Sequence, residues 1–240
     1  MVCTKKSFLA LTAAMLILVS CKTVNDLTAK VSETISPSSA ARTSDGLVID
    51  SLIALDILKH REDKRVFLTA LKNAAGVAIF PTVYKAGFFV GAEGGNGLVI
   101  ARDTHGNWGY PAFYTLAGGS WGLQFGGQRA GVVLILRSRK AVEAILKHQG
   151  KAGADVSIAL GSIGSGLEGS TTTNLAADII AFSDAKGLFG GVSLEGTAII
   201  RRNDLNLEYY GADVTPAAIL IEHAQRNAQA DTLRDALIVR

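Results

Sequence analysis

The spacing of apolar residues changes along the chain and predicts different secondary structure on either side of residue 75. Between residues 47 and 72, leucines recur at helical spacings around a charged cluster at 59–65; they are Leu52, Leu55, Leu58, Leu68 and Leu71. Residues three or four apart share one side of an α-helix. The pattern therefore predicts one or two amphipathic helices over 47–72.

From residue 76 to residue 211 the period shortens and glycine becomes frequent. This block holds 25 of the 26 glycines, which separate short runs rich in aromatic and β-branched residues. Alternating apolar residues are typical of strands with one buried side. Such alternation groups Tyr84, Ala86, Phe88, Val90 and Ala92 on one predicted strand, and Trp121, Leu123 and Phe125 on another. Because glycine within strands marks bulges and sharp bends, we expect a strongly curved sheet.

Further helices and strands are predicted beyond residue 129. Residues 130–136 are apolar throughout, which is typical of a strand covered on both faces. Ser138 precedes a helical pattern and is a suitable N-cap. A second β stretch is predicted over 154–210. Thr215 and Pro216 suit the N-cap and first position of a helix that runs to the C-terminus with at most one break near Ala230.

These elements together predict an α+β fold. We expect a curved, antiparallel, barrel-like, glycine-rich sheet, flanked by N-terminal, central and C-terminal helices.

The N-terminus carries a targeting signal. Lys5 and Lys6 precede a short apolar run, residues 8–19, which ends in the sequence Leu18-Val19-Ser20-Cys21. This layout is typical of a lipoprotein signal peptide, and the run is shorter than the ~20 residues that span a bilayer. We expect a signal peptide over 1–20, fatty acylation of Cys21, a flexible tether over 21–46 and a domain over 47–240. Lys22, rather than Asp, follows the cysteine, so we expect the outer membrane, facing the periplasm.

Composition narrows the range of functions. The formal charge is +3 for the whole chain and +1 once Lys5 and Lys6 leave with the signal, and the remaining basic residues are scattered among acids. A nucleic-acid-binding surface would show a basic stripe, so we expect no nucleic-acid partner. Cys3 leaves with the signal and Cys21 is acylated, which excludes thiol catalysis and cysteine-bound zinc in the folded part.

The chain also lacks the common catalytic motifs. The four histidines, at 60, 105, 148 and 223, are widely separated and none has the H-E-x-x-H spacing. The sequence contains neither a P-loop nor a G-x-S-x-G nucleophile elbow. We therefore expect a protein that is not an enzyme and that folds without a metal or cofactor.

Five motifs, in the same order, resemble those of the SYLF domain family. They are residues 76–81 (GVAIFP), 85–88 (KAGF), 108–111 (WGYP), 119–126 (GSWGLQFG) and 186–196 (KGLFGGVSLEG). The resemblance covers the chain from about residue 47 to the C-terminal helix. It implies a lipid-binding module: eukaryotic members bind phosphoinositides, some bind and bundle actin, and bacterial members are commonly lipoproteins. Since a periplasmic protein does not meet actin, we expect lipid binding here.

The candidate lipid-binding residues are basic residues beside predicted strands and turns. In some eukaryotic members an N-terminal amphipathic helix takes part in membrane binding, but segment 47–72 carries several acids and we do not place the site there. Phosphate groups need guanidinium or ammonium donors. The candidates are Lys85, Lys186, Arg129, Arg102, Arg137, Arg139 and Lys140. We expect them to bind anionic, phosphoinositide-like phospholipid head groups; the alternative is an envelope structural or protein-interaction module without head-group specificity.

Overall fold

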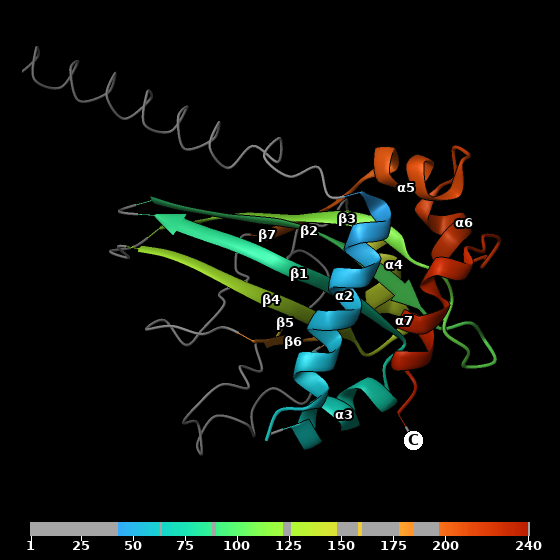
Figure 1. Ribbon diagram of the computed structural model, residues 1–240, viewed down its shortest axis with the longest axis horizontal. Helices are drawn as coiled ribbons and strands as arrows, with labels where there is room; N and C mark the ends of the chain where they lie inside the picture. Colours follow the sequence, from blue (N-terminus) through green and yellow to red (C-terminus); the bar gives the residue numbers. More distant parts are fainter. Residues whose placement is uncertain are drawn as a thin grey trace, which may run out of the picture. The chain divides into compact units, whose positions relative to one another are not determined.

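The computed structural model describes residues 43–62, 64–87, 90–121, 126–147, 158–159, 178–184 and 197–239. Cys21, Lys186, and residues 88–89 and 122–125 lie outside these ranges. Residues 42–240 form one compact unit. Figure 1 shows that its long strands run side by side while helices lie on both faces of the sheet and at one end of it.

The centre of this unit is a seven-stranded sheet with the order β5-β6-β4-β1-β2-β3-β7. The strands are β1 (Gly76–Gly87), β2 (Val90–Ala101), β3 (Ala112–Trp121), β4 (Gly126–Leu136), β5 (Ile158–Ala159), β6 (Ile179–Ser183) and β7 (Thr197–Arg201). All neighbours pair antiparallel except β5 and β6. In the described residues β5 and β7 are the outer strands and do not pair, so the sheet is open. The α+β class is confirmed.

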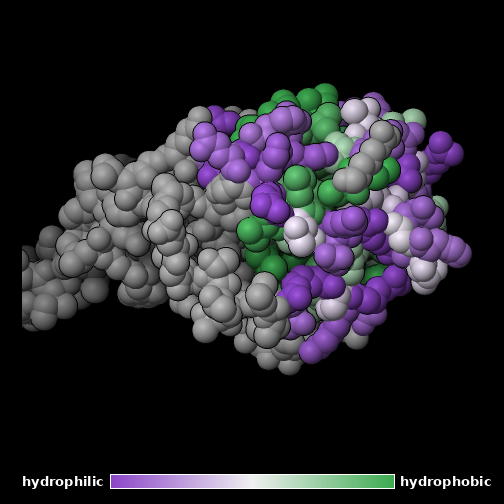
Figure 2. All heavy atoms as spheres, turned by 90° about the horizontal axis from the view of Figure 1, so that it is seen from below, coloured by the Kyte–Doolittle hydropathy of each residue, from purple (hydrophilic) through white to green (hydrophobic). Residues whose placement is uncertain are grey.

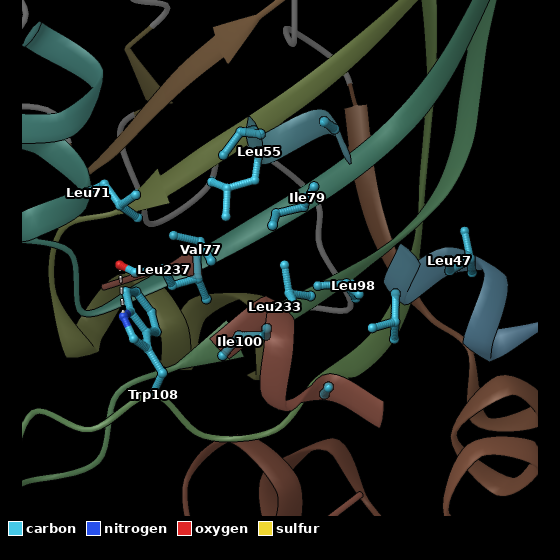
Figure 3. Close-up of a cluster of buried hydrophobic side chains, with 14 of the residues drawn as sticks. Leu47, Leu55, Leu71, Val77, Ile79, Leu98, Ile100, Trp108, Leu233 and Leu237 are labelled. Carbon is cyan, nitrogen blue, oxygen red and sulfur yellow. Dashed lines mark hydrogen bonds between the residues drawn. The ribbon is translucent and has the colours of Figure 1, made fainter. Parts of the chain in front are cut away.

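Helices cover the two faces of the sheet differently. One face, which we call the α2 face, packs against α2 (Ser44–Lys59), α3 (Lys64–Lys72), α5 (Asn203–Tyr210), the 3₁₀ turn η2 (Ala228–Ala230) and α7 (Asp231–Ala236). The opposite α4 face packs against α4 (Arg139–Lys147) and α6 (Pro216–Leu220). Figure 3 shows the core on the α2 face, where Leu55, Ile79 and Leu233 come from three different elements.

Trp108 belongs to this core. Its indole Nε1 donates a hydrogen bond to the Leu237 carbonyl at 3.2 Å, which ties the C-terminal segment to the loop after β2 (Figure 3). The indole is buried. A buried tryptophan whose N–H has an acceptor satisfies both its apolar and its polar part.

A bulge interrupts β1 near the middle of the sheet. The register shifts between Ile79 and Tyr84 against β2, and between Phe80 and Val83 against β4. A Cβ atom at Gly95 would overlap the Thr82 carbonyl, and one at Gly97 would overlap the Ile79 carbonyl. These two glycines therefore let the carbonyl groups of the bulge approach β2, as expected for glycine inside strands.

Local sequence signals fix most helix boundaries as expected. The segment 47–72, in which one or two helices were predicted, is covered by the two helices α2 and α3. The Ser138 hydroxyl accepts a hydrogen bond from the Ala141 N–H at 3.1 Å, so Ser138 caps α4 as predicted. Thr215 likewise caps α6 by accepting a hydrogen bond from the Ala218 N–H at 3.2 Å.

Three predictions of secondary structure are wrong. Residues 84–92 do not form one strand: β1 ends at Gly87, β2 begins at Val90, and Ala86 pairs with Ala92. The last β stretch ends at Arg201, and residues 203–210 form α5 instead. Leu205, Leu207 and Tyr209 alternate with polar neighbours like a strand, which explains that error.

The third error concerns the C-terminal helix, which stops at Leu220. Ile219 and Leu220 pack on the α4 face, whereas Ala230 and Leu233 pack on the α2 face. The chain therefore crosses from one face of the sheet to the other between α6 and η2. A continuous helix could not follow that path.

Candidate functional site

Lys85 is paired inside the protein. Its Nζ lies 3.8 Å from Oε2 of Glu93, its register partner on β2. Glu93 is buried, and burial raises the pKa of its carboxyl group while Lys85 opposes that shift. Removing the lysine would leave a buried carboxylate without its counter-charge. Lys85 is therefore a structural cation in this fold.

Arg102 is also used internally. Its Nε donates to the Ala74 carbonyl at 3.0 Å and its Nη1 to the Gly106 carbonyl at 2.6 Å. The guanidinium carbon stands 4.1 Å from the centre of the Trp108 ring, a cation–π contact. Burial lowers the pKa of Arg102. Arg102 joins the loops at the end of the sheet.

Three further candidates lie together where β4 leads into α4. Arg137 is exposed and has a partner in the fold, and its backbone N–H donates to the Asp178 carbonyl at 3.0 Å. Arg139 Nε lies 3.9 Å from Oε1 of Glu143, one helical turn later. Lys140 is exposed. At this junction the exposed residues Arg137 and Lys140 thus have the acidic residues Glu143 and Asp178 as neighbours.

Arg129 lies on β4, opposite Tyr84 of β1. Residues paired across two strands point to the same face of a sheet, so Arg129 shares a face with Tyr84. Lys85 follows Tyr84 in β1 and therefore points to the opposite face. The structure therefore does not gather the candidate cations into one patch. Arg129 belongs to the α2 face and Lys85 to the α4 face, while Arg102, Arg137, Arg139 and Lys140 lie at the end of the sheet; Lys186 is outside the described residues.

Sequence reasoning missed an apolar surface on α2. Ile49, Ile53 and Ile57 are 60%, 53% and 44% exposed. They follow one another at intervals of four residues, so they form one stripe along the helix. Leu47, Ser51, Leu55 and Leu58, among others, are buried on the opposite side. Successive residues of an α-helix are about 100° apart around its axis, which puts the isoleucines opposite the buried side. The stripe therefore faces directly away from the sheet.

The start of α3, the next helix along the chain, carries further exposed residues. Val66 is exposed, and so are Lys64 and Arg65 beside it. We define the α2–α3 surface as Ile49, Ile53, Ile57, Lys64, Arg65 and Val66. Figure 2, seen from below, shows hydrophobic residues open to solvent among hydrophilic ones. The signal in the sequence was the four-residue spacing of the isoleucines, which the leucines of the buried side masked.

The described residues contain neither a metal-binding cluster nor a membrane-spanning helix. No group of three or more His, Cys, Asp or Glu side chains there could hold a metal ion. Within the same ranges, no helix is both long and apolar enough to cross a membrane.

Comparison with known proteins places the chain in a family. Residues 117–238 match the Ysc84 family model, described as "Las17-binding protein actin regulator". Human SH3 domain-containing YSC84-like protein 1 is 36% identical over 180 residues, which cover 75% of this chain and 52% of that protein. Saccharomyces cerevisiae Protein YSC84 is 36% identical over 166 residues, 68% of this chain and 35% of that protein.

A third relative, SH3 domain-containing protein PJ696.02 of Schizosaccharomyces pombe, is 36% identical over 168 residues, 69% of this chain and 39% of that protein. The chain thus spans about half the length of the human relative and less of the two yeast relatives. The resemblance to the SYLF family is confirmed by the family model and by these identities: the chain belongs to the Ysc84, or SYLF, family.

Proposed function

We propose that this protein is a lipid-anchored, non-enzymatic module that binds the surface of anionic phospholipid membranes. The observation that carries this proposal is the α2–α3 surface, in which α2 exposes an isoleucine stripe and α3, which contacts α2, exposes Lys64 and Arg65. A helix with one exposed apolar face can bury that face at the boundary between head groups and acyl chains. Each basic residue near an anionic surface adds ~1 kcal/mol.

The size of the stripe favours a membrane over a second copy of the chain. A stable protein interface buries ~800 Å² on each partner. Three partly exposed isoleucines and one valine supply much less than that. A lipid surface does not require a complementary shape, and the anchor at Cys21 would raise the effective concentration of the domain at the membrane.

The proposed lipid contact is the α2–α3 surface, whereas the sequence predicted basic residues beside strands and turns. Lys85 and Arg102 serve the fold, so they are not the primary lipid contacts. Acidic residues such as Asp56 flank the stripe and weaken its attraction to anionic lipid. Burial of the isoleucine side chains must therefore supply a large part of the binding energy. Localisation at the outer membrane rests on the signal sequence and Lys22 alone.

Sedimentation with vesicles tests the proposal. Residues 22–240, which include the whole compact unit and lack the acylated cysteine, should sediment more with phosphatidylglycerol vesicles than with phosphatidylcholine vesicles, and less as salt rises. Ile53→Ser should weaken binding about tenfold, since it removes an apolar side chain from the contact. Leu207→Ser on α5 is a matched control, because Leu207 is 49% exposed outside this surface. Equal effects of the two substitutions would refute the assignment.

A protein-interaction module is the second candidate function. The description of the matching family names a protein partner, Las17, and an effect on actin. If the chain shows no lipid dependence at low salt, the exposed isoleucine stripe would be assigned to a protein partner.

A further inference from the structure

Tyr84 lies on a part of the sheet that the helices of the described residues leave open. Its side chain is 52% exposed, although β1 is a central strand. Tyr84 pairs with Gly94, four residues along β2 from Leu98 in the core of the α2 face, so Tyr84 belongs to the α2 face. Figure 1 shows the long strands continuing past α2. The helices therefore cover only one end of this face.

The positions beside Tyr84 carry very small side chains. The register places Gly94 of β2, Ala117 of β3 and Ala198 of β7 in one row with it. All three residues are partly exposed. Because neighbouring strands lie about 4.8 Å apart, this row forms a flat floor about 14 Å long next to the tyrosine. A flat ligand on this floor can contact the tyrosine ring.

A fixed amide group borders the floor. Asn96 Oδ1 accepts a hydrogen bond from Thr115 Oγ1 at 2.6 Å and another from Arg202 Nη1 at 2.9 Å. These two contacts hold the amide in place. No described residue accepts a hydrogen bond from Asn96 Nδ2, so its N–H groups can bind an oxygen of a ligand. We define the β1–β7 surface as Tyr84, Gly94, Asn96, Thr115, Ala117 and Ala198.

The charges around the β1–β7 surface are balanced. Arg129 on β4 is exposed, and the Asp184 carboxylate lies against Gly131, two residues along that strand. Arg202 is paired with Asp204 through two hydrogen bonds of 2.8 and 2.6 Å. These two guanidinium groups and two carboxylates of the described residues sum to no net charge. A polar ligand without net charge therefore matches this surface better than an anion does.

The β1–β7 surface also offers little apolar area. Gly94, Ala117 and Ala198 present backbone and methyl groups, whereas a stable protein interface buries ~800 Å² on each partner. An oligosaccharide requires less apolar area. The C–H groups on the faces of its rings pack on an aromatic side chain, and its hydroxyl and acetamido oxygens accept hydrogen bonds.

We propose that the β1–β7 surface binds a neutral oligosaccharide. One sugar ring packs on Tyr84, and a carbonyl or hydroxyl oxygen of the sugar accepts a hydrogen bond from Asn96 Nδ2. This binding does not depend on the membrane contact proposed above, because none of the residues of the β1–β7 surface belongs to the isoleucine stripe of α2.

Calorimetric titration of the full chain in phosphatidylcholine nanodiscs tests the site, with the neutral oligosaccharide chitotetraose as the probe. We expect an affinity that changes less than about twofold between low and high salt, because no net charge takes part. Tyr84→Ala should weaken binding about tenfold through loss of the ring contact, whereas Tyr84→Phe should retain it. Ile238→Ser is a control that should have no effect, because Ile238 is 54% exposed outside this surface.

Asn96→Asp tests the second contact. This substitution keeps an oxygen for Thr115 and Arg202 and replaces the Nδ2 donor with an acceptor. It should therefore weaken the binding of chitotetraose about tenfold. In nuclear magnetic resonance spectra, the side-chain amide signals of Asn96, assigned by their loss in this variant, should shift when chitotetraose is added.

Three results would overturn the inference. Absence of binding at millimolar chitotetraose would show that the surface does not bind neutral oligosaccharides. Binding that Tyr84→Ala leaves unchanged, or that does not shift the Asn96 amide signals, would take place elsewhere on the protein. Preferential binding of the acidic oligosaccharide tetragalacturonate would show that Arg129 selects an anion. None of these results bears on the vesicle experiment, which depends on the isoleucine stripe.

Discussion

Lys85 and Glu93 form a charged pair on the α4 face of the central strands. Lys85→Met would leave the buried Glu93 carboxylate without its counter-charge, at a cost on the order of 3 kcal/mol in the free energy of unfolding. Urea denaturation measures this loss. The double variant Lys85→Met/Glu93→Leu should recover most of it, because an apolar pair needs no compensation.

The same variant should respond to pH in a defined direction. Burial raises the pKa of Glu93, and Lys85 opposes this effect. Without the lysine, the folded protein binds a proton at Glu93 more readily than the unfolded chain does, so stability falls as pH rises. The destabilisation by Lys85→Met should therefore be smaller near pH 4 than near pH 7. A loss independent of pH would show that the carboxylate is not its cause.

His223 should make the fold sensitive to acid. It has a positive φ of 52°, and its ring packs against Gly109. Burial lowers its pKa; Arg139 adds to this effect, while Asp103 and the Arg102 backbone oppose it.

Since the unfolded chain binds the proton more tightly, stability is complete above the ordinary histidine pKa of about 6.5 and is lost as pH falls below it. Asparagine tolerates a positive φ and does not titrate. In thermal unfolding between pH 8 and pH 5, His223→Asn should therefore lose less stability than the wild type. Parallel pH profiles would contradict the assignment to His223.

The bulge in β1 depends on glycine at one position of β2 and not at its neighbour. A Cβ atom at Gly95 would overlap the Thr82 carbonyl, whereas one at Gly94 would meet the Leu116 carbonyl at 3.5 Å, an ordinary contact. Gly95→Ala should cost about 1–3 kcal/mol through backbone displacement. Gly94→Ala should be nearly neutral in the same urea titration. Similar losses for both would mean that the bulge tolerates a side chain.

The elements show which parts of the fold a sequence encodes locally. Ser138 and Thr215 predict helix starts correctly, because a cap is a contact within four residues. The alternation that continues through Tyr84 and Ala92 cannot reveal the hairpin turn between them. Nor can local spacing show the end of α6, which follows from the need to cross to the other face of the sheet.

The dispersal of the candidate cations over the fold could not be predicted for a related reason. Lys85 and Arg129 are both basic residues in glycine-rich strands, but their faces depend on a register that the β1 bulge shifts. That shift is a contact between strands and leaves no local pattern. The isoleucine stripe of α2 could have been found from its spacing alone, had both sides of the helix been considered.

In the proposed function, the molecule as a whole combines a lipid anchor with a weakly binding surface. In the α2 face, one layer of helices separates the sheet from the proposed membrane, and the α4 face is turned away from it. The expected tether from Cys21 would precede α2, the helix that carries the stripe, in the sequence. Anchor and surface would then act on the same bilayer, which explains how a surface of few residues could suffice.

Replacement of Cys21 separates the two contributions. Several acyl chains hold a protein stably, since each buried methylene adds ~0.8 kcal/mol, whereas the α2–α3 surface alone would give reversible, salt-sensitive binding. We expect labelled palmitate to enter the wild-type protein and not Cys21→Ser, whose signal peptide should remain uncleaved or whose product should leave the membrane in a high-salt wash. The wild type should resist that wash. If the wild-type protein incorporates no label although its signal is cleaved, Cys21 is not acylated and attachment depends on the α2–α3 surface.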